Sequence, residues 1–168
     1  EYDPVLKRID LLSANDNTLP YWFYQRQLTP KQLRYIDNLT PHGAILVFMD
    51  NLGLGIYLCQ QLDHAAISYI KVSNASSIEQ FSQHHYGLDP QQPQHYHQLL
   101  SALRTAQIDI TSIIHLGAYR NNPEALNSHE SLRMAQYHGT YSLLFLIQAL
   151  DKGYAAHLPA RLMVVTAN

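Results

Sequence analysis

The chain has 168 residues, of which 46% are apolar, and its formal net charge at pH 7 is −2. This length favours one domain with a sizeable core, and without a basic surplus or an acidic tail we expect no nucleic-acid partner. The single cysteine, Cys59, excludes an internal disulfide and fits a reducing compartment. The first residues lack the basic and apolar regions of a signal peptide, and the longest apolar stretch, residues 143–150, is far short of the roughly 20 residues of a membrane helix. We therefore expect a cytoplasmic protein with no membrane partner.

The N-terminal part of the chain is polar and irregular. Residues 1–18 include the loop-forming run Asn15-Asp16-Asn17, which favours a linker or a peripheral segment. Residues 19–28 are rich in aromatic side chains and favour an edge strand. We place the domain at residues 19–168. The chain begins without Met and ends in the strand-like residues 161–168, so we expect a truncated piece of a longer polypeptide.

A regular pattern begins at Ala44. Residues 44–48 are continuously apolar, which predicts a strand buried on both faces. After a glycine-rich turn, leucines recur every four residues at 54, 58 and 62, as on one face of a helix. Residues 67–72 then predict a second strand.

The same alternation continues to the end of the chain. Asp89-Pro90 precedes a helix whose apolar stripe is Tyr96, Leu99, Leu100 and Leu103. Residues 110–116 predict a third strand, residues 131–150 a long helix that stops at Lys152-Gly153, and residues 161–166 a fourth strand. Strands that alternate with helices indicate right-handed crossovers and a mostly parallel sheet. We therefore predict an α/β, Rossmann-like fold in three layers.

The first strand-to-helix turn resembles a dinucleotide-binding loop that has lost essential positions. The general motif G-x-G-x-x-G keeps Gly53 and Gly55 here, with Leu58 in place of the third glycine. The short-chain reductase motif T-G-x-x-x-G-x-G keeps the same two glycines but begins with Phe48-Met49. Asp50 adds a carboxylate where a pyrophosphate would lie. We expect Asp50, Gly53 and Gly55 to be a vestigial loop, with the glycines kept for the turn and for packing.

The residues after the second predicted strand offer little to a cofactor. A dinucleotide site there supplies Asp or Glu to the ribose, or Arg to a 2′-phosphate. This chain has Lys71-Val72-Ser73-Asn74, of which Lys71 or Asn74 could reach a phosphate. We expect no cofactor in this chain.

No catalytic motif is found in the sequence. Short-chain reductases resemble one another in a Tyr-x-x-x-Lys pair, but the residues four positions before the four lysines are Asp3, Gln27, Ile67 and Gln148. There is no G-x-S-x-G motif, and Cys59 lies within a predicted helix as a small buried group. We therefore expect no catalytic residue.

The histidines do not have metal-ligand spacing. His84, His85, His95 and His97 match no H-E-x-x-H motif and have no cysteine pair nearby. We expect them to be surface residues, and we expect no metal. His115 ends a strand, where a packed and hydrogen-bonded role is favoured over a catalytic one.

Four segments resemble the ketoreductase domains of modular polyketide synthases. Residues 86–100 have that family's order of an aromatic residue, an aliphatic-Asp-Pro and a Tyr-x-x-Leu-Leu. Residues 113–118 look like its Ile-Val-His-Leu-Trp-Ser strand end, with Gly117 in place of Trp, and residues 44–55 like its degenerate glycine loop. Residues 163–166 look like its Trp-Leu-Val-Thr strand, followed by Ala167 where a Gly is usual.

The resemblance implies a division of labour between two Rossmann-like halves. In that family the C-terminal half binds NADPH and carries the catalysts, and the N-terminal half is a truncated copy that braces it. This chain resembles the N-terminal half, so by itself it is expected to be structural and non-enzymatic. Its parent would be a multifunctional polyketide synthase that reduces a β-ketoacyl thioester held on an acyl carrier domain.

Two alternatives remain. The parent ketoreductase could itself be inactive and serve as a scaffold, or the chain could be a small NAD(P)-binding, reductase-like module with an unusual loop. In the leading interpretation the catalytic half is the partner. The isolated chain is then expected to expose apolar surface or to self-associate.

Overall fold

The computed structural model describes residues 2–8, 24–30, 43–120, 128–154 and 161–166. These residues belong to two units, residues 1–39 and residues 40–168. In the first unit, β1 (Tyr2–Arg8) pairs antiparallel with β2 (Tyr24–Pro30), so that Tyr2 lies opposite Pro30. The predicted edge strand at 19–28 overlaps β2, and its residues 19–23 lie outside the described residues. β2 belongs to the first unit because it pairs with β1, and this unit ends at Leu39.

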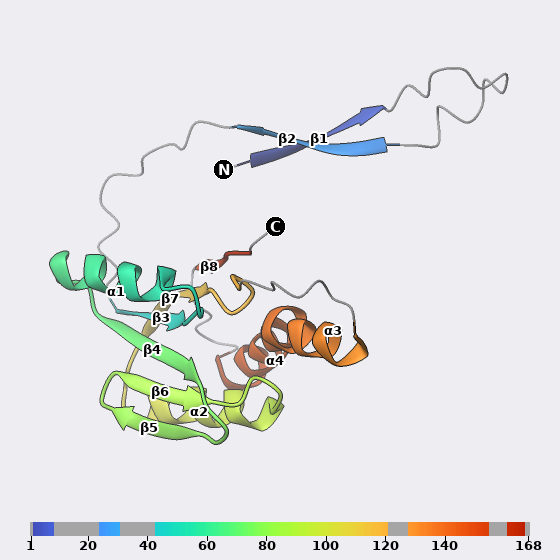
Figure 1. The fold of residues 1–168 in the computed structure, drawn as a ribbon. Coiled ribbons are helices and arrows are strands. Elements are labelled where there is room, and N and C mark those ends of the chain that lie inside the picture. Colours follow the sequence, from blue (N-terminus) through green and yellow to red (C-terminus); the bar gives the residue numbers. More distant parts are fainter. Residues whose placement is uncertain (1, 9–23, 31–42, 121–127, 155–160, 167–168) are drawn as a thin grey trace, which may run out of the picture. The chain divides into compact units, whose positions relative to one another are not determined.

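The second unit is built on a six-stranded, mostly parallel sheet (Figure 1). Its order is β5-β6-β4-β3-β7-β8, and only the β5–β6 pair is antiparallel. The strands are β3 (Ala44–Phe48), β4 (Tyr69–Asn74), β5 (Glu79–Ser82), β6 (His85–Leu88), β7 (Ile110–His115) and β8 (Arg161–Val164). The predicted α/β, Rossmann-like fold is confirmed.

Helices cover both faces of the sheet. On one face α1 (Leu54–His64) packs through Leu58 and Leu62 against Ile45 and Val47 of β3. On the other face lie α2 (Pro93–Thr105) and α4 (Ser142–Tyr154), which enclose the larger part of the core. This arrangement gives the three predicted layers, with β3 buried at all five positions between them.

The sequence patterns with a clear period are confirmed. All four residues of the predicted stripe on α2 are buried, namely Tyr96, Leu99, Leu100 and Leu103. In α1 the stripe is shifted: Cys59 and Leu62 are buried, whereas Leu54 is exposed. The loop before α1 sets which side of the first turn faces the sheet, and the spacing of the leucines alone does not specify that side.

The strand pair β5–β6 was not predicted. The segment from Glu79 to Leu88 is polar, and glycine within a strand is usually unfavourable. Here Tyr86 and Leu88 are buried beneath α2, while a Cβ on Gly87 would lie 2.7 Å from Cε2 of Phe81. This Cβ would also lie 2.8 Å from Cβ of Ala75, which cannot rotate away as the half-exposed Phe81 ring can, so glycine at position 87 avoids a close contact there.

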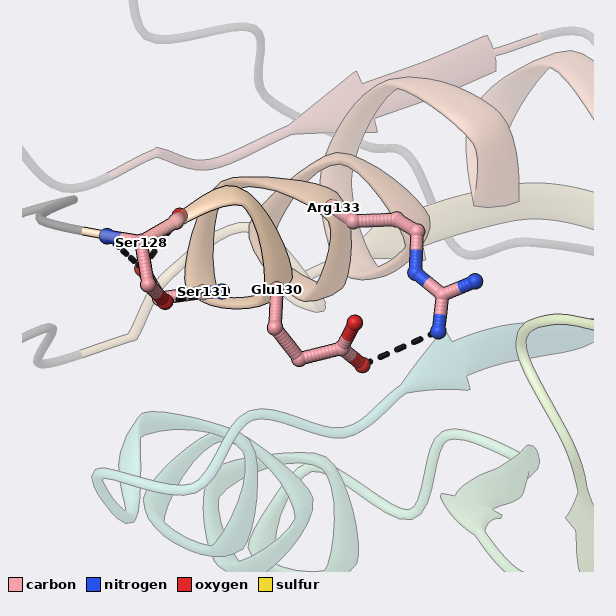
Figure 2. Close-up of polar contacts among 4 residues, drawn as sticks. All are labelled: Ser128, Glu130, Ser131 and Arg133. Carbon is pink, nitrogen blue, oxygen red and sulfur yellow. Dashed lines mark hydrogen bonds and ion pairs between the residues drawn. The ribbon is translucent and has the colours of Figure 1, made fainter.

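The predicted helix at residues 131–150 is composed of three segments. α3 (His129–Gln136) runs through a π-helical turn, Tyr137–Tyr141, into α4, which continues past the predicted stop to Tyr154. At the start of α3, Ser128 Oγ accepts a hydrogen bond from the Ser131 backbone N–H at 3.1 Å, and Ser131 Oγ accepts one from the Ser128 N–H at 3.2 Å (Figure 2). This reciprocal cap fixes the first turn, whereas the exposed Glu130–Arg133 ion pair, 2.9 Å long, contributes little. Within the described residues, no helix is long and apolar enough to span a bilayer.

The buried stripe of α2 gives a test of the core. Leu99→Ala should lower the free energy of unfolding by about 2–5 kcal/mol, because Leu99 is fully buried and its loss leaves a cavity. Ile56→Ala, at a position 60% exposed, is the matched control and should change it by less than about 0.5 kcal/mol. Urea denaturation of the two variants measures both values, and equal effects would contradict this packing.

Candidate functional site

The turn between β3 and α1 is occupied by a carboxylate of the chain itself. Asp50 Oδ2 accepts hydrogen bonds from the backbone N–H groups of Leu52 at 2.8 Å and Leu54 at 3.0 Å. Its Oδ1 accepts a third from the N–H of Gly55 at 2.6 Å. The amides of Leu54 and Gly55 belong to the first turn of α1, and that of Leu52 lies just before the helix. The first N–H groups of a helix lack partners within the helix. In a dinucleotide-binding fold such groups bind the pyrophosphate.

The two glycines of the loop are explained by its shape. Gly53, at the start of α1, has φ 96°, a left-handed conformation that favours glycine. A Cβ on Gly55 would lie 2.9 Å from Cε of Met49 and 3.0 Å from Oδ1 of Asp50. Gly55 therefore allows Met49 and the Asp50 carboxylate to approach the helix. Gly53 thus provides the left-handed turn, and Gly55 provides the space for the approach of Met49 and Asp50.

The electrostatics of the loop favour this carboxylate in its charged form. Partial burial raises the pKa of Asp50, but the hydrogen bonds from Gly55, Leu52 and Leu54 together bring it below its ordinary value. The positive end of the helix dipole acts in the same direction. A phosphate would have to displace this anion or lie beside it. Asp50, which the sequence predicts to repel a pyrophosphate, is hydrogen-bonded through its carboxylate to the loop amides.

The last residues of β4, which follow the strand predicted at 67–72, are also hydrogen-bonded to other parts of the chain. Ser73 Oγ hydrogen-bonds Nε2 of His85 at 2.8 Å, and Asn74 Nδ2 lies 3.4 Å from Nδ1 of His138. No carboxylate stands at residues 71–74 to bind a ribose. Lys71 lies on β4 and is half-buried, where its charge lowers the pKa of His85, after the larger effect of burial.

The usual ligand position of such a sheet, at the carboxyl ends of its strands, is almost filled. The cavity there measures about 10 Å³, room for about one water molecule. His115 Nε2 and Ser142 Oγ are 2.5 Å apart within it, and the Ser142 hydroxyl also lies 3.2 Å from the His138 carbonyl oxygen. The cavity is lined by Phe48, Met49, Val72, Asn74, Leu88, Pro90, Tyr96, His115, Gly117, His138 and Ser142.

His115 has the packed, hydrogen-bonded role that its position at the end of a strand favoured. Its ring stacks on Phe48 at 5.2 Å, and burial lowers its pKa to about 4. Since His115 and Ser142 are only 1% and 3% exposed, a substrate cannot reach this pair as a nucleophile and its base. A Cβ on Gly117 would lie 2.8 Å from the His138 carbonyl oxygen and 2.9 Å from Cε1 of His115. Gly117, where the ketoreductases have Trp, thus lets the π-helical turn close over the strand ends.

The remaining histidines and the cysteine are placed separately. His95, in the first turn of α2, accepts a hydrogen bond at Nδ1 from the backbone N–H of Asp89, which precedes the helix, at 3.1 Å. His85 on β6 is hydrogen-bonded to Ser73 on β4. In the part of the chain that the structure describes, no group of three or more His, Cys, Asp or Glu residues could hold a metal ion. Cys59 is buried in α1, and burial raises the pKa of its thiol.

The contact of Asp50 with α1 can be tested by substitution and pH. Asp50→Ala should lower the free energy of unfolding by about 1–2 kcal/mol at pH 7, because the first amides of α1 lose their acceptor. Since the pKa of Asp50 is lowered on folding, its contribution is complete above the ordinary value of 3.8 and is lost as pH falls through the folded value. Urea denaturation from pH 7 downward should show a constant difference from the unsubstituted chain until about pH 5, and then a smaller one. A difference that grows on acidification would contradict this.

The buried His115 predicts a second pH dependence, which acts below pH 6.5 and therefore at higher pH than that of Asp50. His115 has a folded pKa of about 4 against an ordinary 6.5, so the unfolded chain binds more protons between these values. Its effect is absent above pH 6.5, and acidification to pH 5 should cost about 2 kcal/mol. His115→Gln should lower stability at pH 7 but make its decline from pH 7 to pH 5 shallower by that amount. If the decline in stability between pH 7 and pH 5 is unchanged in His115→Gln, another group causes it. His84→Gln, at an exposed position, is the control and should leave this decline unchanged.

The comparisons with known proteins agree with this fold. The chain is similar to a solved structure described as the adenylation, ketoreductase and pseudo Asub multidomain structure of a keto acid-selecting NRPS module. The identity is 28% and the TM-score 0.69, over 82% of this chain and 11% of that one. It is also similar to the crystal structure of an N-terminal ketoreductase from a macrolactin assembly line, with 20% identity and a TM-score of 0.60, over 73% of this chain and 24% of that one. No curated protein matches the chain significantly.

The chain thus spans only a small part of either solved protein. The resemblance to assembly-line ketoreductases that the four sequence segments carried is confirmed. A family model described as beta-ketoacyl synthase-like, N-terminal, matches residues 43–155, which include all of the helices and every strand of the larger sheet except β8. With most of its length matched, the chain belongs to the beta-ketoacyl synthase-like, N-terminal family.

Proposed function

We propose that this chain is the non-catalytic, structural half of a polyketide synthase ketoreductase. The observation that carries the proposal is the Asp50 carboxylate, which binds three amides at the start of α1 within a ketoreductase-like fold. A half that binds NADPH needs these amides for phosphate. A half that uses them for its own side chain gains a rigid turn and gives up the cofactor.

In this proposal the reaction takes place in the other half of the parent. That half binds NADPH, and it reduces a β-ketoacyl thioester carried by an acyl carrier domain in the cytoplasm. The family description names β-ketoacyl chemistry, and the two similar structures name ketoreductases. A β-ketoacyl thioester fits both descriptions, because it has the ketone group that a ketoreductase reduces.

The outer side of α4 is the surface we propose for the contact with the catalytic half. Tyr141, at the end of the π-helical turn, and Leu144 and Ile147 of α4 follow one another at intervals of three residues and are 38%, 43% and 51% exposed. Such a row of large apolar side chains on a helix is typical of a face covered by another element. Contacts between domains of one chain commonly bury about 600–1,500 Å², and a row of this length could form the centre of one.

The alternative, a scaffold half of an inactive ketoreductase, shares every feature of this chain. It differs only in the catalytic half, which would then lack the Tyr-x-x-x-Lys pair and would oxidise no NADPH. A small NAD(P)-binding module, in contrast, requires a cofactor on this chain itself, at the loop that Asp50 occupies.

Titration with NADPH tests the proposal. Calorimetry should detect no binding to this chain at millimolar NADPH, whereas the intact protein should bind NADPH and oxidise it when a β-ketoacyl thioester is supplied. Micromolar binding to this chain would overturn the structural assignment. An intact protein without NADPH oxidation would favour the inactive scaffold.

A substitution on α4 tests the bracing. Ile147→Asp should lower the rate of NADPH oxidation by the intact protein at least tenfold, because a buried charge at the contact would separate the halves. Ile56→Asp, at a similarly exposed position on α1, is the matched control and should have little effect. Circular dichroism of both variants shows whether this chain still folds.

A further inference from the structure

A cavity of about 320 Å³ lies away from the carboxyl ends of the strands, where the end of α1, the start of β4 and the end of β5 meet (Figure 1). Its volume is at the lower end of the range for small-molecule sites, about 300–1,000 Å³. All of the residues that line it belong to the described part of the chain, and they are Asp63, Ile67, Ser68, Tyr69, Lys71, Ser82 and His84. Every one of them except Ile67 has a polar side chain, so the cavity is suited to a polar ligand.

Two opposite charges line this cavity without neutralising each other. Lys71 is half-buried on the interior strand β4, and Asp63 is exposed on the last turn of α1. Within the ranges that the structure describes, neither side chain forms an ion pair. A half-buried ammonium group without a counter-ion carries a desolvation cost that a bound carboxylate would offset.

The register of β4 places Lys71 on the same side of the sheet as α1. Tyr69 packs with the residues beneath α1, and side chains two residues apart on a strand share a face. The buried thiol of Cys59 on α1 lies within the field of both charges. Burial raises the pKa of this thiol most, and beyond that Lys71 lowers it and Asp63 raises it. The two charges are therefore near enough to one point of α1 to act on a single small ligand.

Hydrogen bonds fix the two sides of the cavity. The Tyr69 hydroxyl donates to Asp63 Oδ2 at 3.0 Å, and burial together with this hydrogen bond raises the pKa of Tyr69 to about 12, so that it remains a donor. No group of the described residues donates to Asp63 Oδ1, which leaves its lone pairs for a ligand. On the other side, the backbone N–H of Lys71 donates to the His84 carbonyl oxygen at 2.9 Å and holds His84 beside β4.

We propose that this cavity binds a small α-amino acid, with its carboxylate at Lys71 and its ammonium group at Asp63. A simple anion would meet the repulsion of Asp63, and a simple cation that of Lys71. A dipolar ion satisfies both charges at once, and Ile67 is the apolar residue in the lining against which a small aliphatic side chain packs. The inference goes beyond the proposed function, because no part of it involves NADPH or the other half of the parent.

Calorimetric titration of this chain with L-alanine, propionate and ethylamine tests the site. Propionate lacks the ammonium group of L-alanine, and ethylamine lacks its carboxylate. L-alanine should bind with a millimolar Kd, and each of the other probes about tenfold more weakly or less, because each loses one charged contact. Binding of propionate as tight as that of L-alanine would mean an anion site and overturn the proposal. So would the absence of L-alanine binding up to about 100 mM.

Matched variants locate the binding in this cavity. Lys71→Met should abolish detectable L-alanine binding, and Asp63→Asn should weaken it about tenfold while it keeps an oxygen that accepts from Tyr69. Lys152→Met and Asp151→Asn remove the same charges from exposed positions on α4 and should leave the Kd unchanged.

Circular dichroism shows whether each variant folds. If Lys71→Met does not fold, Asp63→Asn decides alone, and an unchanged Kd in that variant contradicts the proposal. The outcome is separate from the NADPH titration, since a chain that bound both NADPH and L-alanine would uphold this inference while the structural assignment fails.

Discussion

The hydrogen bonds of the Asp50 carboxylate determine which backbone amides near the start of α1 remain free to bind a ligand. Parallel α/β sheets offer a ligand the free N–H groups at the start of a helix, and an anion binds there at little structural cost. Here the anion is covalently attached, at a high effective concentration, and Gly55 gives it room at 2.6 Å from the amide nitrogen. An external phosphate would have to displace the Asp50 carboxylate, which is part of the chain and cannot diffuse away.

At the ends of β4 and β7, side chains are likewise hydrogen-bonded within the chain. Ser73 and Asn74 are paired with histidines, and the π-helical turn brings Ser142 to the buried ring of His115. π-Helical turns often mark functional sites, but this one closes a cavity of about 10 Å³ instead of opening one. At these places, where this architecture usually binds ligands, the described side chains make contacts within the chain.

The sequence was most informative where burial imposes a period. The run 44–48 and the stripe on α2 were predicted correctly because a strand and a helix buried against the core each require a fixed apolar spacing. β1, β5 and β6 were missed because their residues are largely polar, and pairing with a distant segment, not local composition, makes them strands. The sequence drew attention to Asp50 as a carboxylate in the loop, but its three hydrogen bonds to the backbone depend on a turn geometry that residue spacing does not reveal.

The two edge strands of the larger sheet differ in the apolar surface that their described residues expose. Polar residues at β5 cost little in water, whereas Leu162, Met163 and Val164 leave apolar area exposed on both faces of β8. The row on α4 adds to this exposed area. Hydrophobic stabilisation scales with the apolar area removed from water, so covering these surfaces would stabilise this unit as much as its partner. In the proposed arrangement the two halves of the parent would then stabilise each other.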